Sequence, residues 1–414
     1  MNILKIFCYK FVIYDDNFVI VYKILLLMKV YFDETIIGKE WWIPFLNPIL
    51  WICKWWNPDS TWFYSEEQIL DWTTKWKKLL SYSNVELCDY IVFPINFKID
   101  YISLLEEQTK LWKEYGKKVI VFYYNDCEYS IPNLYNNLIV FRTSMNDLNP
   151  DNEFFMPWFP NDLWKEYWID YKSDLDDVSI WYVGYRWYYS VWSYLMYILA
   201  VIKFFFIEKT FIWDLIYKVL INRSRKWWFL KKKIWEFLWK KWIIKDPEIV
   251  GNSFLYLFYC FNKWKICREK TIESINKSWI KFKFIEKNKL LKPRNKDKRD
   301  YVSIIKNCTF PLATRWDGNY SYRLYEIMSL WKIPLFIDTK CRLPFDNEID
   351  YKNIFVWVPF DDIKNIKKYV DGYLSKNKNK LEEIQKNIRF IYENYLTMNS
   401  YYIKIIHQLA ESLK

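Results

Sequence analysis

Two arginines and several hydroxyl and amide side chains lie close together in the segment "RWDGNYSYR", residues 315 to 323. The pattern predicts a strand end at Arg315, a loop, and a helix that begins near Ser321, with Asn319 or Ser321 as its N-cap. The first turn of a helix carries free N–H groups and the positive end of the helix dipole. Arg323 would lie in that turn, where a cation disfavours the helix unless a phosphate or diphosphate lies beside it. The segment therefore indicates a site for a phosphorylated ligand.

Glu326 follows Arg323 by three residues and so shares its face of the predicted helix. A carboxylate in this place could accept hydrogen bonds from the two hydroxyls of a ribose. The same spacing fits an ordinary Arg323–Glu326 surface ion pair, worth less than about 1 kcal/mol. Spacing alone leaves both interpretations open.

The elements that must position these residues alternate between strand and helix, as in a parallel α/β sheet. The clearest unit is the strand "DYIVFP", a helix that stops at Gly116, and a strand from Val119 to Tyr123. The strand "NLIVF" (137–141) follows. A second series begins at "VSIWYVGY" (178–185) and continues through "IKFKFIE", "CTFPLAT", "IPLFI" and "NIFVWV". Ligands of such sheets bind beyond the carboxyl ends of the strands, which is where the Arg315 loop would lie.

The tail of the chain has apolar residues spaced by three and four, which predicts one long amphipathic helix. Met28, which opens "MKVYFDE", is a better start than Met1, so the first residues are of uncertain status. We predict four regions: an uncertain extension (1–27), a Rossmann-like acceptor domain (28–175), a Rossmann-like nucleotide-sugar domain (176–375), and a helix that packs across both domains (376–414).

Glycine is rare and tryptophan is abundant, with 6 Gly and 26 Trp among 414 residues. Ordinary proteins are about 7% glycine, which would give roughly 29 here. Tryptophan doublets such as Trp41-Trp42 lie among Pro, Asn, Asp and Lys, the usual neighbours of glycine in turns. We hypothesise that many of these tryptophans stand for glycines encoded by UGA, as in some bacterial lineages. A truly tryptophan-rich protein is the alternative.

Charge and cysteine content restrict the partners. The net charge of +12 favours anionic partners but does not choose among nucleotides, lipid headgroups and nucleic acid. The eight cysteines form no C-x-x-C pair and the chain has one histidine, so no metal site and no disulfide framework is expected. These features predict a reducing compartment, the cytoplasm.

Membrane contact depends on the tryptophans. The apolar stretch 191–202 is far shorter than the ~20 residues that a membrane-spanning helix needs. The segment 226–245 mixes Lys with Trp, Phe and Leu as interfacial helices do. With glycine at its tryptophans the helix would be lost, since each interior glycine costs about 1 kcal/mol. Peripheral contact with the inner face of the membrane therefore stays open.

The segment from Phe310 to Asp350 resembles the carboxyl-terminal signature of the exostosin-like glycosyltransferases (glycosyltransferase family 47). The family pattern resembles "R-G-D-G-N-x-S-x-R-x-x-E", then "G-x-I-P" and "L-P-F". The departures are Trp316 and Trp331, both at glycines of the family pattern. The amino-terminal half resembles the family more loosely. The matching residues are Arg315, Asp317, Gly318, Asn319, Ser321, Arg323, Glu326, Ile333, Pro334, Asp338, Leu343, Pro344, Phe345 and Asp350.

The resemblance implies a GT-B-like α/β fold, with two Rossmann-like domains facing a cleft and a long C-terminal helix. It implies transfer of a sugar from a nucleotide-sugar donor to a saccharide acceptor in surface glycan synthesis, with inversion and without a metal ion or other cofactor. A retaining transferase of the same fold remains an alternative. The residues expected to bind the donor are Arg315, Asp317, Asn319, Ser321, Arg323 and Glu326.

Such a reaction needs a base to take the proton of the acceptor hydroxyl. The sole histidine, His407, is expected on the tail helix in a core or surface role, so the base should be a carboxylate. Asp126 follows the strand "KVIVFYY" and is the first candidate for the catalytic base, with Glu128 and Glu153 behind it. Loop carboxylates also commonly do no more than cap turns.

The main rival from another class is a non-enzymatic binder, a basic and aromatic protein that stacks bases and follows phosphates, or one that lies on a membrane surface. It needs exposed aromatic residues interleaved with lysine, which the segment 226–245 offers only if its tryptophans are genuine. If the chain is the transferase, no nucleic-acid partner is expected.

Overall fold

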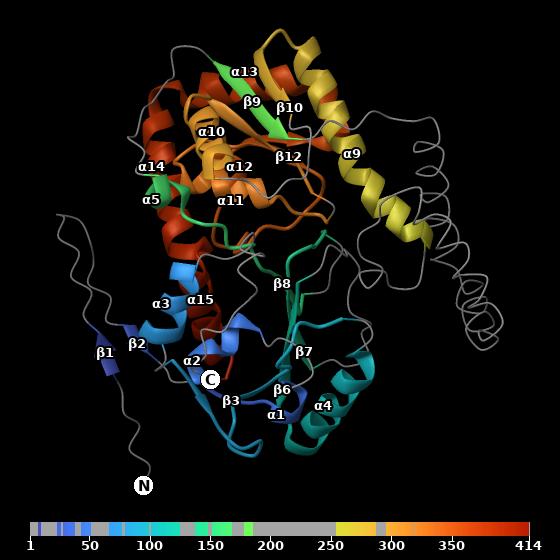
Figure 1. The fold of residues 1–414 in the computed structure, drawn as a ribbon, viewed down its shortest axis with the longest axis vertical. Coiled ribbons are helices and arrows are strands. Elements are labelled where there is room, and N and C mark those ends of the chain that lie inside the picture. The colour runs from blue at the N-terminus through green and yellow to red at the C-terminus, as the bar shows by residue number, and fades with distance from the viewer. Residues whose placement is uncertain are drawn as a thin grey trace.

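The structure of the chain, a computed structural model, contains two parallel β-sheets, one above the other in Figure 1, with a helical tail running alongside both. Two short strands near the amino terminus, β1 (Phe7–Tyr9) and β2 (Lys23–Leu25), form a separate antiparallel pair. The described residues are 7–9, 23–25, 28–37, 43–50, 66–76, 79–98, 101–124, 137–147, 151–167, 178–184, 254–286, 295–316 and 318–413.

The amino-terminal sheet has six strands in the order β4-β3-β5-β6-β7-β8, and every pair in it is parallel. Helix α4 (Ile102–Tyr115) connects β5 to the neighbouring strand β6, which confirms the β-α-β unit predicted there. The strands are β3 (Met28–Tyr31), β4 (Leu80–Tyr82), β5 (Tyr90–Val92), β6 (Lys118–Tyr123), β7 (Leu138–Arg142) and β8 (Glu153–Phe155); the other helices of this half are α1 (Glu34–Ile37), η1 (Pro44–Leu46), α2 (Asn47–Leu50) and α3 (Glu66–Lys75). Helix α5 (Leu163–Tyr167) follows β8 in the chain but packs in the core of the carboxyl-terminal sheet.

The carboxyl-terminal sheet has five parallel strands in the order β10-β9-β11-β12-β13. All five predicted strands of this half are present. They are β9 (Ser179–Gly184), β10 (Lys281–Glu286), β11 (Phe310–Ala313), β12 (Leu335–Asp338) and β13 (Val356–Pro359), with helices α9 (Phe254–Lys277), α10 (Asn295–Lys306), α11 (Tyr322–Ser329), α12 (Tyr351–Ile354), η5 (Phe360–Asn365) and α13 (Ile366–Asn377).

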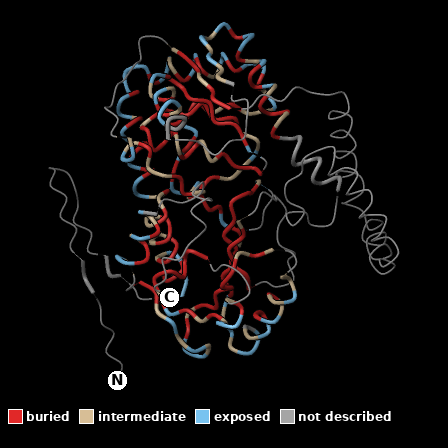
Figure 2. The backbone as a smooth tube through the Cα atoms, in the orientation of Figure 1, coloured by how far each residue is buried: buried red, intermediate tan, exposed pale blue. Residues whose placement is uncertain are grey.

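Alternating strand residues build separate cores on the two faces of the amino-terminal sheet, as a period of two requires. In β6, Ile120 and Phe122 join the core that also holds α3 and the end of the tail. Val119 and Val121 join the core beneath α4. Figure 2 shows buried strands inside both sheets and exposed positions mainly on the outer helices and turns.

The tail is helical as predicted but contains a break. After η6 (Lys378–Lys380), α14 (Leu381–Ile391) continues through a π-helical turn, η7 (Tyr392–Leu396), to Thr397, whose backbone is extended at φ −72° and ψ 155°. Helix α15 (Met398–Glu411) begins there. Helix α14 packs in the core of the carboxyl-terminal sheet and α15 in that of the amino-terminal sheet, so one segment joins both halves. The predicted α/β class, two Rossmann-like parallel sheets with a long helical tail, is confirmed.

Three helix ends use a left-handed residue. Gly116 follows α4 with a φ of 69°, as expected for a glycine that stops a helix. Trp279 and Trp331 lie just beyond α9 and α11 with φ values of 62° and 60°. At the end of α11 the N–H groups of Trp331 and Lys332 donate to the carbonyls of Met328 and Ile327, at 3.2 Å each. This is a Schellman motif, and its left-handed position is usually glycine.

Some expectations concern residues outside the described ranges. These are the apolar stretch 191–202, the segment 226–245, and the site candidates Asp126, Glu128 and Asp317. Within the ranges given above, no helix has both the length and the apolar character needed to cross a membrane.

Candidate anion-binding site at the carboxyl ends of β9 and β11

The loop after β11 leads directly into the predicted helix, α11. Ser321 is the N-cap residue, with φ −133° and ψ 107°, and the N–H of Leu324 donates to its carbonyl. Its hydroxyl is buried yet makes no hydrogen bond among the described residues. A buried hydroxyl without a partner costs free energy, so this one favours an added acceptor at the start of the helix.

Three arginines, Arg268, Arg315 and Arg323, gather at this end of the sheet, and we call them the arginine cluster. Arg268 and Arg315 are each 2% exposed. Both lie close enough to the thiol of Cys267 to lower its pKa, although burial outweighs them and raises that pKa to about 11. Guanidinium groups are charged, forked donors that match phosphate geometry, so three of them at one strand end favour an anionic ligand such as a phosphate.

Aromatic rings hold the arginines in place. The guanidinium carbon of Arg323 lies 4.5 Å from the ring centre of Tyr182, which is close to the carboxyl end of β9. That of Arg268 lies 4.3 Å from the ring of Trp264 and 5.7 Å from the ring of Trp316. The two indoles stack with centres 6.0 Å apart and an interplanar angle of 13°. Such cation–π contacts orient a guanidinium without neutralising its charge.

Glu326 lies near Arg323 and accepts a hydrogen bond of 2.7 Å from the hydroxyl of Tyr301. Burial and then the charge of Glu326 raise the pKa of Tyr301 well above its usual value. Burial lowers the pKa of Arg323, but Tyr182, Tyr301 and Glu326 together raise it above its usual value. Arg323 is therefore cationic across the working pH range.

Asn319 has a different place from the one expected of a ligand-binding side chain. It is fully buried, and its side chain donates to the carbonyls of Met145, at 2.9 Å, and Thr339, at 3.4 Å. It also accepts a 2.6 Å bond from the Thr339 hydroxyl, while its N–H donates to the Ser144 hydroxyl at 2.8 Å. These bonds tie the loop before α11 to the loop after β7, in the other sheet.

Among the candidate bases, only Glu153 lies within the described residues. It is 2% exposed and forms an ion pair with Arg142 at 2.6 Å. This carboxylate is therefore engaged by an arginine inside the protein. His407 lies partly buried on α15, as expected of a core or surface histidine.

Sequence analysis did not find Tyr182, Arg268 or Tyr301. They come from β9, α9 and α10, all outside the motif in sequence, and the fold brings them to it partly because β9 lies beside β11. The one local signal was the position of Tyr182 near the carboxyl end of a predicted strand. Across the described ranges, no group of three or more His, Cys, Asp and Glu residues is arranged to hold a metal ion.

No protein-family model matches the chain. A segment of 64 residues, 16% of the chain, is 33% identical to Exostosin-1 of Drosophila melanogaster. That segment corresponds to 8% of Exostosin-1, so the match spans only a small part of the relative.

Solved structures overlap the fold loosely. The OtsA apo structure shows 10% identity and a TM-score of 0.37, over 78% of this chain and 73% of that one. An alpha-glucosyltransferase in complex with UDP and a 13-mer DNA containing a HMU base shows 10% identity and a TM-score of 0.30, over 79% and 81%. At these scores the overlap decides nothing by itself, and the fold class rests on the strand order of the two sheets.

Proposed function

We propose that this chain is a glycosyltransferase that moves a sugar from a nucleotide-sugar donor to a saccharide acceptor. The observation that carries the proposal is the arginine cluster, which lies beside the unbonded hydroxyl of Ser321 at the carboxyl ends of β9 and β11. Ligands of parallel sheets bind at this edge. The short likeness to Exostosin-1 supports the same class.

The proposed roles follow from charge and geometry. Ser321, the first N–H groups of α11, Arg315 and Arg323 would bind the diphosphate and stabilise it as it departs. Glu326, oriented by Tyr301, would accept hydrogen bonds from the ribose. Asn319 would position the loop instead of contacting the donor, since its side-chain atoms already bond within the protein.

The finer assignments belong to the same proposal. We propose inversion by a single displacement through an oxocarbenium-like state, with Asp126 as the base and Asp317 as a further donor contact. We propose that the reaction needs no metal ion and serves surface glycan synthesis. The product anomer, read by NMR, would distinguish inversion from retention.

The donor site is tested by titrating nucleoside diphosphates and their sugars into the protein by calorimetry. We expect Arg323→Ala to weaken binding of the best ligand by about ten- to a hundredfold, the value of a hydrogen bond to a charged group. Arg342→Ala is the matched control, because Arg342 pairs with Asp346 in a partly exposed bridge and is not among the proposed donor contacts. Equal affinities for Arg323→Ala and Arg342→Ala would refute the donor site.

The ribose contact has its own test. Glu326→Gln should weaken ligands with an intact ribose and leave their 2′-deoxy counterparts little changed. Equal losses for both ligands would remove Glu326 from this role.

The salt dependence of binding distinguishes the transferase from a non-enzymatic nucleic-acid binder. Nucleic-acid affinity falls steeply with ionic strength, whereas affinity for a small nucleotide should fall only modestly.

A further inference from the structure

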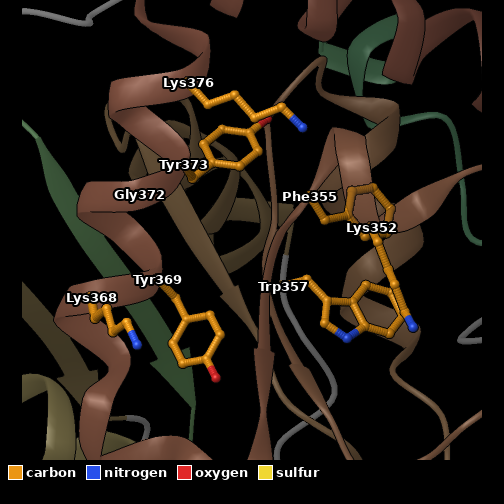
Figure 3. A pocket seen from close by; sticks show the side chains of 8 residues that line it. All are labelled: Lys352, Phe355, Trp357, Lys368, Tyr369, Gly372, Tyr373 and Lys376. Carbon is orange, nitrogen blue, oxygen red and sulfur yellow. The ribbon is translucent and has the colours of Figure 1, made fainter.

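A cavity of about 300 Å³, separate from the proposed donor site, lies between helix α13 and the edge strand β13 of the carboxyl-terminal sheet. Figure 3 shows Tyr369 of α13 and Trp357 of β13 on opposite sides of the gap. Lys352 of α12 and Lys368 of α13 also line it. The arginine cluster lies beyond β9 and β11, whereas this cavity lies beside the edge strand β13, so the two sites share no residue. This size is at the lower end of the range for small-molecule pockets.

The lining of this cavity is cationic and aromatic. Three exposed lysines, Lys352, Lys368 and Lys376, line it, and none of the described residues that line it is acidic. Lys376 donates to the amide oxygen of Asn353 at 2.9 Å. The pKa of the Asp362 carboxyl is lowered mainly by its bond from Tyr369 and also by the nearby charge of Lys368, although none of the three lysines forms an ion pair among the described residues. Three ammonium groups around one cavity favour an anion, which a phosphate satisfies best because it accepts from several donors.

The rings of the cavity are fixed by hydrogen bonds at their polar ends. The hydroxyl of Tyr369 donates to Asp362 at 2.7 Å, and the indole N–H of Trp357 donates to Asp338 at 3.1 Å. Both side chains are only partly buried. The polar atoms of both rings are used. Trp357 also packs against Phe336, with ring centres 4.7 Å apart, and the Nζ of Lys352 lies 5.7 Å from the Trp357 ring centre. The parts of the two rings that line the cavity therefore offer an apolar surface beside a cation.

Gly372 gives this cavity its open space. A β-carbon added at Gly372 would meet no atom within 4 Å, although the residue lies within helix α13. A glycine inside a helix costs about 1 kcal/mol relative to alanine. The position therefore accepts a side chain sterically, and a large one would enter the cavity.

We propose that this cavity binds a small phosphorylated ring compound, a sugar phosphate or a nucleoside monophosphate, independently of the donor site. The lysines would bind the phosphate, and Trp357 and Tyr369 would hold the ring between them. The site goes beyond the proposed transferase activity, because none of its residues belongs to the donor site.

Calorimetric titration of the full chain with glucose 1-phosphate, uridine monophosphate and inorganic phosphate tests the proposal. We expect one ring compound to bind at least about tenfold more tightly than inorganic phosphate, because only it uses the rings. The tighter ring compound identifies the ligand as sugar phosphate or nucleotide. Equal affinities for all three probes, or no binding at all, would overturn the proposal.

Variants of the residues that line the cavity test whether the ligand binds there. The double variant Lys352→Gln/Lys368→Gln should lower the affinity at least about tenfold through charge. Gly372→Leu should lower it similarly by filling the space, while leucine favours the helix. Lys367→Gln is the matched control, since Lys367 pairs with Asp371 and does not line the cavity.

Arg323→Ala distinguishes binding in this cavity from binding in the donor site, because it should leave the affinity of the cavity for the probes unchanged. If Arg323→Ala abolishes binding of the probes while both cavity variants retain it, the ligand occupies the donor site and the second site does not exist. If the cavity variants alone lose binding, the second site stands even if the protein proves not to be a transferase.

Discussion

At the scale of single residues, tryptophan occupies backbone positions that suit glycine. Trp279 follows α9 with a φ of 62° and is 95% exposed, so its side chain has little packing to lose. A left-handed conformation costs an ordinary residue about 1–2 kcal/mol, and glycine avoids most of this cost. We therefore expect Trp279→Gly to stabilise the chain by about 1 kcal/mol, measured by chemical denaturation.

Trp72 is the matched control for this prediction. It is fully buried within helix α3, and its indole N–H donates to the carbonyl of Pro44 at 3.1 Å. Trp72→Gly should lower the free energy of unfolding by at least about 3 kcal/mol.

The gene sequence gives an independent check, since UGA is expected at codons 279, 316 and 331. UGG at all three codons would contradict the glycine hypothesis.

Trp316 differs from Trp279 and Trp331 because its φ is not positive. Its backbone therefore gives no reason to prefer glycine, and the case for glycine rests on the space that its side chain takes. Its side chain stacks on Trp264 and lies beside Arg268, and it is 37% exposed. The indole therefore occupies space beside the arginine cluster. We expect Trp316→Gly to raise the affinity for the best nucleoside diphosphate by about tenfold, measured by calorimetry. Unchanged or weaker binding would show that the indole is tolerated or contacts the ligand.

Local patterns predicted part of the site and missed its partners. Arg323 and Glu326 share one helix face and Ser321 caps that helix, all from spacing within one segment. Asn319 could not be placed from spacing, because the three residues it bonds to, Ser144, Met145 and Thr339, lie in loops that only the folded chain brings together. Arg268 was equally hidden, since a helical arginine is ordinarily a surface residue.

At the scale of elements, period and composition identified the strands because each is a short apolar run flanked by breaks. The prediction of the tail was less complete, since the apolar spacing continues across Thr397 and gives no sign of the break in the helix. Three observations locate it: the π-helical turn, the extended backbone of Thr397, and the bond from Met398 N–H to the side chain of Gln68 at 3.0 Å. The break lets α14 and α15 follow different sheets.

Thr397 caps α15, because its hydroxyl accepts from the N–H of Ser400 at 3.3 Å. Removal of an N-cap hydroxyl costs about 1 kcal/mol. We therefore expect Thr397→Ala to lower the free energy of unfolding by about this amount, and Thr397→Ser to retain most of it. Urea denaturation followed by circular dichroism measures both variants. Equal stability of Thr397→Ala and the parent chain would show that packing alone fixes the break.

At the scale of the whole molecule, the two sheets are joined at more than one place. Arg389 of α14 is 1% exposed and donates to both carboxylate oxygens of Asp162, at 2.8 and 2.6 Å. On α15, the Tyr401 hydroxyl donates to the carbonyl of Phe155 at 3.0 Å. These bonds make the tail a structural part of both halves, so its folding and the relative position of the sheets are coupled.

Asn319 joins the two sheets next to the proposed donor site, and its replacement provides the test at this scale. Asn319→Asp replaces the donating amide with a second acceptor oxygen, which would then face the carbonyls of Met145 and Thr339 inside the protein. Burying an unpaired charge is costly. We expect a loss of at least about 3 kcal/mol in the free energy of unfolding, larger at pH 8 than at pH 5, because protonation restores a donor.

The matched control is Asn394→Asp, which adds the same charge at an exposed amide that bonds only to the carbonyl of Phe390. It should change the stability by less than about 0.5 kcal/mol. Asn319→Ala separates charge from bond loss: it removes the same bonds without adding a carboxylate, so its cost should not change with pH. If Asn319→Asp is as stable as Asn394→Asp at pH 8, the loops before α11 and after β7 do not depend on this amide, and the donor loop is held by its own backbone.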